Sequence, residues 1–377
     1  MEKYIMMDEE RQIIDLAKAI LEKELVPRLD ECEKKGIFPM EVFKSLYDAG
    51  LYGLDIPEQY GGVGISHETA FKLNEEMAWY DAGFAFSFRL ASYVANLVYM
   101  AGSDYLKEYV SSLILGGKLG AFCLTEADAG SDAAAIRTTA VQDGNDYVLN
   151  GVKSFISNGA IADFYIVAAT IDRSLKHKGI TLFLVEKERG VQVGKIEDKM
   201  GFKTSMTSEV IFDNVRVPAD HLIGAEGKGF NYAMRDMESI RPTTMTYAVG
   251  LMQRALDEAV KYAKVRKTFG TPIINNQGLA YILADMQKLI HVSRSSLMTI
   301  ARQLDQNQPL NGAGSSVKIF VSDCAMKVTS DAIQVLGGYG YMKEYPVEKL
   351  LRDAKLFAIF EGTNQIQMNI LAGMLSR

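Results

Sequence analysis

The sequence RDAKLFAIFEGTNQIQ, residues 352–367, sets one acidic residue, Glu361, directly after an apolar run over residues 356–360. Gly362 and the polar residues after it predict a chain break and a new helix, with Thr363 or Asn364 as its N-cap. Apolar burial raises the pKa of a carboxyl group, whereas hydrogen bonds from free backbone N–H groups lower it. A carboxylate balanced between these effects can remove a weakly acidic C–H proton near neutral pH. A helix-capping or salt-bridging Glu fits the same stretch, so the stretch alone leaves both interpretations open.

Length and composition are those of an ordinary soluble globular protein. The chain has 377 residues, enough for two or three domains or one large one. Hydrophobic residues make up 48% and charged residues 23% of it, and the net charge of −6 gives no reason to expect a nucleic acid or an anionic membrane as partner. Three widely spaced cysteines form no zinc pattern and no disulfide framework. No metal site is expected.

Targeting signals are not evident in the sequence. Acidic residues at positions 8–10 occupy the place of the apolar core of a signal peptide. No run of about 18 apolar residues predicts a membrane-spanning helix. We therefore expect a cytoplasmic protein.

Three zones differ in their hydrophobic periodicity. Helical spacing runs through residues 1–118, β-branched and aromatic runs with turn signals between them fill residues 119–225, and long apolar stripes at helical spacing return in residues 226–377. The predicted fold is α+β and multidomain: an N-terminal helical domain, a small middle β domain (sandwich or barrel) and a C-terminal four-helix bundle.

Four further stretches carry residues suited to ligand binding. Small and hydroxyl-bearing residues in LTEADAGSD (124–132) and SFISNG (154–159) allow close backbone approach to a planar or anionic ligand. RKTFG (266–270) ends the longest apolar stripe with Arg266, which either contacts a phosphate or complements a helix C-terminus. IQVLGGYGY (333–341) again places glycines where a ligand can approach. Each stretch alone would more often be an ordinary loop.

Together, in this order and at these distances, the motifs resemble those of the acyl-CoA dehydrogenase family of flavoenzymes, with a length like that of its short- and medium-chain members. The resemblance covers essentially the whole chain and rests on FCLTE with AGSD (122–132), RKTFG, QVLGG (334–338), YPVE (345–348), RDAK (352–355) and EGTNQ (361–365). It implies bound FAD, an acyl-CoA substrate, electron-transferring flavoprotein as electron acceptor, and a homotetramer built as a pair of dimers.

The resemblance also implies roles for individual residues. Those that would line the flavin ring are Phe122, Leu124, Thr125, Phe155 and Ser157. Those that would hold the adenine and pyrophosphate across a dimer interface are Arg266, Phe269, Gln277, Gln334 and Gly338, and Thr363 and Gln365 would also touch the nucleotide. Those that would contact or adjoin the substrate are Ser131, Arg241 and Gly362.

Glu361 then becomes the base that takes the α-proton of the thioester, while the β-hydrogen leaves as hydride to flavin N5 and yields a trans-2-enoyl-CoA. Some relatives carry the base on another helix, at the position that aligns with Ile240, which cannot titrate. The sequence therefore shows no rival to Glu361. Ser157, Phe155 and Phe360 replace residues that are more usual in the family, and all three replacements look conservative.

Arg89 lies in the apolar segment 83–101, which builds the acyl-pocket floor in relatives and is a few residues shorter than expected. It would either pair with a polar end of the acyl chain, as a nearby Arg does in glutaryl-CoA relatives, or meet a structural acid. Alternatives to the predicted function are an enoyl-CoA reductase running in reverse, an acyl-CoA oxidase, a glutaryl-like dehydrogenase, a desulfinase, and a scaffold without catalysis. Fatty acid or aromatic acid metabolism is the expected setting.

Overall fold

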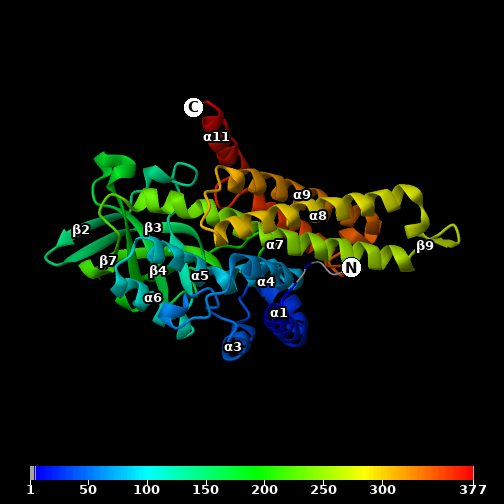
Figure 1. Cartoon of the computed structure of the whole chain (residues 1–377), viewed down its shortest axis with the longest axis horizontal. Helices are drawn as coiled ribbons and strands as arrows, with labels where there is room; N and C mark the ends of the chain where they lie inside the picture. Colours follow the sequence, from blue (N-terminus) through cyan, green and yellow to red (C-terminus); the bar gives the residue numbers. More distant parts are fainter. Residues whose placement is uncertain (1–3, 5, 377) are drawn as a thin grey trace.

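The computed structural model describes residue 4 and residues 6–376. A β domain lies at one end of an elongated molecule, long helices run from it to the other end, and shorter N-terminal helices pack along one side (Figure 1). The predicted order of helical, β and helical regions is confirmed. Within the described residues, no helix is long and apolar enough to cross a membrane.

The N-terminal region is built from helices whose ends follow local capping signals. Ser66 begins α4 by accepting a hydrogen bond from the N–H of Thr69 at 3.1 Å. Asp81 separates α4 from α5 and, as the N-cap of α5, accepts a hydrogen bond from the N–H of Phe84 at 2.8 Å. The helices of this region are α1 (Asp8–Ile20), α2 (Leu29–Lys35), α3 (Met40–Asp48), α4 (His67–Tyr80), α5 (Ala82–Ala101) and α6 (Asp104–Leu115).

The middle region forms one mixed sheet with the strand order β6-β7-β3-β2-β4-β5-β8, and β1 pairs with β4. Alternate side chains of its strands form a separate apolar core around Tyr165, Phe183 and Phe212. The strands are β1 (Gly120–Cys123), β2 (Thr139–Asp143), β3 (Asp146–Ser157), β4 (Phe164–Thr170), β5 (Ile180–Glu186), β6 (Gln192–Ile196), β7 (Thr207–Pro218) and β8 (Leu222–Ile223). The other face of β4 and β5 joins the main core with the helices.

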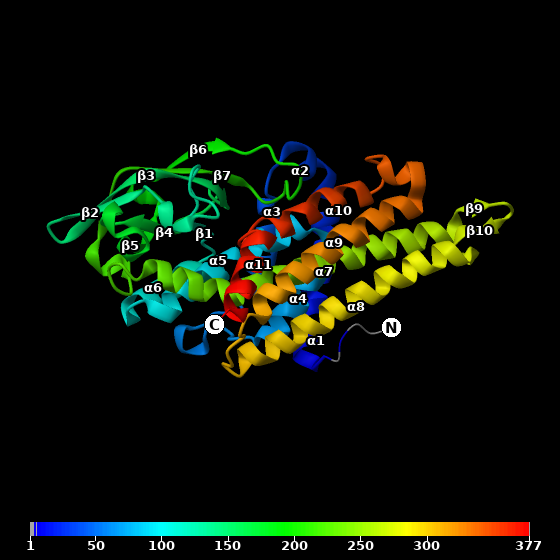
Figure 2. The same ribbon diagram turned by 90° about the horizontal axis from the view of Figure 1, so that it is seen from above.

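The C-terminal region packs three long helices lengthwise, and α7 also packs along α4 (Figure 2). Its helices are α7 (Gly229–Val265), α8 (Gln277–Asp305), α9 (Ala313–Leu336), α10 (Val347–Ala354) and α11 (Asn364–Leu375). A two-stranded hairpin of β9 (Lys267–Thr268) and β10 (Thr271–Pro272) joins α7 to α8 at the end of the bundle remote from the β domain. The last helix, α11, contacts α9 and then projects from the bundle (Figure 1).

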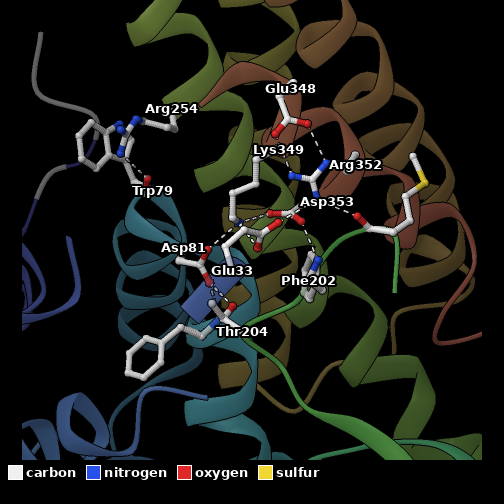
Figure 3. Close-up of polar contacts among 12 residues, drawn as sticks. Glu33, Trp79, Asp81, Phe202, Thr204, Arg254, Glu348, Lys349, Arg352 and Asp353 are labelled. Carbon is white, nitrogen blue, oxygen red and sulfur yellow. Dashed lines mark hydrogen bonds and ion pairs between the residues drawn. The ribbon is translucent and has the colours of Figure 1, made fainter. Parts of the chain in front are cut away.

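All three regions meet at a cluster of charges on α10, shown in Figure 3. Lys349 Nζ lies 2.7 Å from Asp81 Oδ2 and 2.5 Å from Asp353 Oδ2. Asp353 also accepts a hydrogen bond from the N–H of Phe202, in the middle region, at 2.6 Å. Arg352 donates to Glu33 on α2 at 2.8 Å. The cluster therefore fixes α10 against both other regions, just upstream of Glu361.

Lys349→Met should lower the free energy of unfolding by about 3–5 kcal/mol, because it leaves the buried carboxylates of Asp81 and Asp353 without their shared cation. Urea unfolding followed by circular dichroism measures the change. Lys355→Met, at an exposed position six residues further on, is the matched control and should change stability by less than about 0.5 kcal/mol. Equal losses of unfolding free energy in the two variants would contradict the role of Lys349 as the cation shared by Asp81 and Asp353.

Candidate functional site

Glu361 stands at a sharp joint between the helical turn of residues 355–358 and α11. Its φ is 55° and that of Gly362 is 85°, so two consecutive residues adopt the left-handed region. This conformation is costly for a residue with a Cβ, and it persists only where the surroundings impose it. Thr363 Oγ1 accepts a hydrogen bond from the N–H of Ile366 at 3.3 Å, which identifies Thr363, and not Asn364, as the N-cap of α11.

Side chains from other helices hold the backbone of this joint. Arg241 Nε on α7 donates to the carbonyl oxygen of Glu361 at 3.3 Å. Gln367 Nε2 donates to the carbonyl oxygens of Glu361 at 3.3 Å and of Gly362 at 3.0 Å, and Ser315 on α9 in turn donates to Gln367 Oε1 at 2.9 Å. The joint is therefore fixed from α7, α9 and α11 together.

The carboxyl group of Glu361 faces a cavity and carries a shifted pKa. Burial raises the pKa of Glu361 to about 7, against the lowering effects of Arg241 and Lys318. Lys318 Nζ is fixed by a 2.8 Å hydrogen bond to Asn364 Oδ1. Part of Glu361 remains accessible from the cavity, so a ligand that closes the cavity would complete its desolvation. A carboxyl with a pKa near 7 is suited to taking a proton at neutral pH.

The cavity beside Glu361 has a volume of about 30 Å³, so its walls lie close together. Helix α5 forms one wall and α7 another. The residues that line it are Phe86, Leu90, Tyr93, Val94, Leu97, Phe122, Asp236, Met237, Ile240 and Glu361. The segment 83–101 thus contributes five of these side chains, and Ile240 lies in the cavity wall. Asp236 is a second carboxyl in this cavity that the sequence analysis missed; the only signal was its position one helical turn before Ile240.

The loop 124–132 is held to the sheet by a buried ion pair that sequence analysis also missed. Lys153 Nζ on β3 lies 2.8 Å from Glu126 Oε1 and donates to the carbonyl oxygen of Leu124 at 3.0 Å. Thr138 Oγ1 donates to the same carboxylate at 2.6 Å. This fixes a loop of small residues in one conformation. Ser131, at its end, is exposed.

Predicted ligand-binding residues of the middle region lie on β1, β3 and the connecting loop. Phe122 lines the cavity, Leu124 is buried, and Thr125 and Ser157 are half-buried. Phe155 has a φ of 59° and a side chain that is 62% exposed. An exposed aromatic ring on strained backbone is a site that a planar ligand or a partner chain would cover.

The residues predicted to hold the adenine and pyrophosphate lie on the elements at the end of the bundle where β9 is found (Figures 1 and 2). Arg266 and Gly338 line a second cavity of about 470 Å³, whose wall also includes Tyr262 and Tyr339. Phe269 is fully exposed, and Gln277, at the start of α8, and Gln334, near the end of α9, are also exposed. Within one chain, the structure does not bring these residues together with Glu361 and Phe155. Thr363 lies beside Glu361 and Gln365 is exposed on α11.

Arg89 does not line the cavity. Its guanidinium is buried and lies 2.6 Å from Asp55 Oδ1 and 5.9 Å from the centroid of the Tyr93 ring. Burial alone would lower the pKa of Arg89, but the Asp55 carboxylate raises it. This geometry favours the structural alternative over contact with an acyl group.

Comparisons with known proteins cover the whole chain. Residues 7–118, 121–215 and 227–375 match the N-terminal, middle and C-terminal domains of acyl-CoA dehydrogenases. The chain is 40% identical to a short-chain-specific acyl-CoA dehydrogenase of Megasphaera elsdenii, over 98% of each protein. The solved butyryl-CoA dehydrogenase of Megasphaera elsdenii superposes with a TM-score of 0.95 at 39% identity over all of both chains.

A third match is a solved chain from work on the electron transferring flavoprotein of Acidaminococcus fermentans. It has a TM-score of 0.94 and 39% identity, with full coverage of both chains.

Proposed function

The chain belongs to the acyl-CoA dehydrogenase family of oxidoreductases, and from this premise we propose that it oxidises a short-chain acyl-CoA thioester to the trans-2-enoyl-CoA, with Glu361 as the base. The observation that carries the proposal is a carboxyl group with a pKa near 7 that lines a cavity walled by apolar side chains. The 40% identity to a short-chain-specific acyl-CoA dehydrogenase supports a short acyl group.

The chain's own groups account for the proton transfer. The strained joint holds the Glu361 side chain toward the cavity, where its deprotonated carboxylate takes the α-proton. The N–H of Glu361 donates to no acceptor among the described residues, so it is available to the thioester carbonyl oxygen. A hydrogen bond there stabilises the negative charge that develops as the proton leaves.

The residues present fit a bound FAD. Exposed Phe155 beside Phe122, Thr125 and Ser157 offers an aromatic and hydroxyl-bearing surface for the ring. Arg266 and the open backbone at Gly338 suit a pyrophosphate, since a Cβ on Gly338 would meet no atom within 4 Å. When bound, FAD supplies the acceptor for the β-hydride.

We further propose an assembly and an electron acceptor. The predicted ring-lining residues lie on β1, β3 and the loop after β1, whereas Arg266 and Gly338 lie at the end of the bundle remote from the β domain, so a single nucleotide would need groups from two chains. A homotetramer formed as a pair of dimers meets this need. Electron-transferring flavoprotein is the proposed acceptor, supported by the match to the Acidaminococcus fermentans work, and the cytoplasm is the proposed location.

Glu361→Gln should retain bound FAD but lower the rate of anaerobic flavin bleaching by butyryl-CoA about 10²- to 10⁴-fold, because an amide cannot take the proton. Stopped-flow absorbance near the flavin maximum measures the rate. Asp236→Asn is the informative companion, since Asp236 lines the same cavity. If the flavin of Glu361→Gln bleached rapidly with butyryl-CoA and that of Asp236→Asn did not, Asp236 and not Glu361 would be the base.

The pH dependence of kcat/KM should report the pKa of Glu361. Because the base must be deprotonated, kcat/KM should be nearly constant above pH 7 and fall about tenfold per pH unit below it. Steady-state assays with butyryl-CoA between pH 5.5 and 8.5 test this. A rate that stays constant down to pH 5.5 would contradict a base with this pKa.

Arg89→Met should lower the free energy of unfolding by about 3 kcal/mol, because Asp55 loses its buried partner. The ratio of activities on glutaryl-CoA and butyryl-CoA should not change, since Arg89 does not line the cavity. Asp55→Asn, which breaks the same pair from the other side, should give a comparable loss of stability. Selective loss of glutaryl-CoA activity in Arg89→Met would instead show that Arg89 contacts the acyl group.

A further inference from the structure

Asp236 is a buried carboxyl group that the proposed mechanism does not use. It lies on α7, is 6% exposed, and lines the same cavity as Glu361. Its carboxylate oxygens have no hydrogen bond or ion pair with any of the described residues (4 and 6–376). Ser239 Oγ donates to the backbone carbonyl of Asp236 at 2.9 Å and does not reach the carboxylate. A buried acid without a hydrogen-bond or ionic partner is costly to the folded protein.

The cations that act on Glu361 are Arg241 and Lys318, and neither stabilises the charge of Asp236. Arg241 and Lys318 lower the pKa of Glu361, whereas burial and the charge of Glu361 raise the pKa of Asp236 well above its usual value, with no opposing cation. The next cation toward α5, Arg89, is matched by Asp55. Asp236 is therefore left either neutral or dependent on a ligand for its counter-charge.

The rest of the cavity wall suits a cation. Phe86, Tyr93 and Phe122 are aromatic residues that line the same cavity as Asp236. The Tyr93 hydroxyl is occupied by hydrogen bonds with Asn74 at 3.0 Å and Tyr247 at 2.7 Å, and Arg89 already lies 5.9 Å from the centroid of its ring, which leaves the rings of Phe86 and Phe122 for a ligand. Aromatic faces attract ammonium groups, and an adjacent carboxylate adds a charge-assisted contact.

We propose that Asp236 is a specificity-determining residue that selects an acyl-CoA whose acyl group ends in a positively charged nitrogen. The inference rests on the proposed function and adds the chemical class of its substrate. An acyl group ending in a carboxylate would meet two acids in the cavity. A purely apolar one would leave Asp236 without a partner. A cationic one supplies the counter-charge that the fold does not. Met237, flexible and unbranched, can move to enlarge the narrow cavity.

The test uses pairs of thioesters that have the same shape and differ by one charge. The first pair is 5-aminopentanoyl-CoA and hexanoyl-CoA, and the second is 4-(trimethylammonio)butyryl-CoA and 5,5-dimethylhexanoyl-CoA. Dissociation constants for the FAD-loaded Glu361→Gln variant, measured by calorimetry, report binding without turnover. In at least one pair, the cationic member should bind about tenfold or more tightly than its neutral partner.

Asp236→Asn, placed in the same Glu361→Gln background, should abolish this preference. Glu238→Gln is the matched control, because it removes an acid from the same helix that does not line the cavity, and it should keep the preference. Flavin content and thermal unfolding midpoints verify that each variant is folded.

The outcomes separate the two proposals. Tighter binding of the neutral member in both pairs would overturn the role of Asp236. So would a preference for the cationic member that persists in Asp236→Asn. Flavin bleaching by butyryl-CoA would still support the proposed dehydrogenase activity in either case. Absence of bleaching with butyryl-CoA and with all four thioesters would overturn the proposed function itself, and this inference with it.

Discussion

The shared cation at Lys349 is the interaction on which the arrangement of the three regions depends. Burying Asp81 and Asp353 together would be prohibitive without it, and each of these acids also caps or anchors a different part of the chain. Because α10 is held in this way, the short turn that follows it delivers Glu361 to a fixed place. The stability of the domain junction and the position of the proposed base are therefore linked through one helix.

The Glu361 joint shows how strain and burial combine at a site. Left-handed backbone at a residue with a Cβ is unfavourable by about 1–3 kcal/mol, and here side chains from α7 and α11 offset it by holding the carbonyl oxygen. The same joint leaves an N–H group free and turns the carboxyl toward apolar walls. A single local conformation thus provides both a base with a raised pKa and a donor for a developing negative charge.

Two helices, α5 and α7, supply most of the side chains that line the cavity. Helix α5 supplies aromatic and aliphatic side chains, while α7 supplies Asp236, Met237 and Ile240. Two carboxyl groups in one cavity differ in their surroundings, since Glu361 has cations nearby and Asp236 has none. That asymmetry supports the proposed roles of Glu361 in proton transfer and of Asp236 in recognition.

The sequence by itself determined the order of the helical, β and helical regions and led to the proposal of Glu361 as the base, because hydrophobic period, turn residues and motif spacing are local properties. It could not determine that Arg89 meets Asp55, that Lys153 meets Glu126, or that Asp236 faces the cavity. These depend on which residues distant in sequence are packed together. The separation of Arg266 from Glu361 was likewise decided only by the tertiary structure, since Arg241, which holds Glu361, and Arg266 lie far apart along the length of α7.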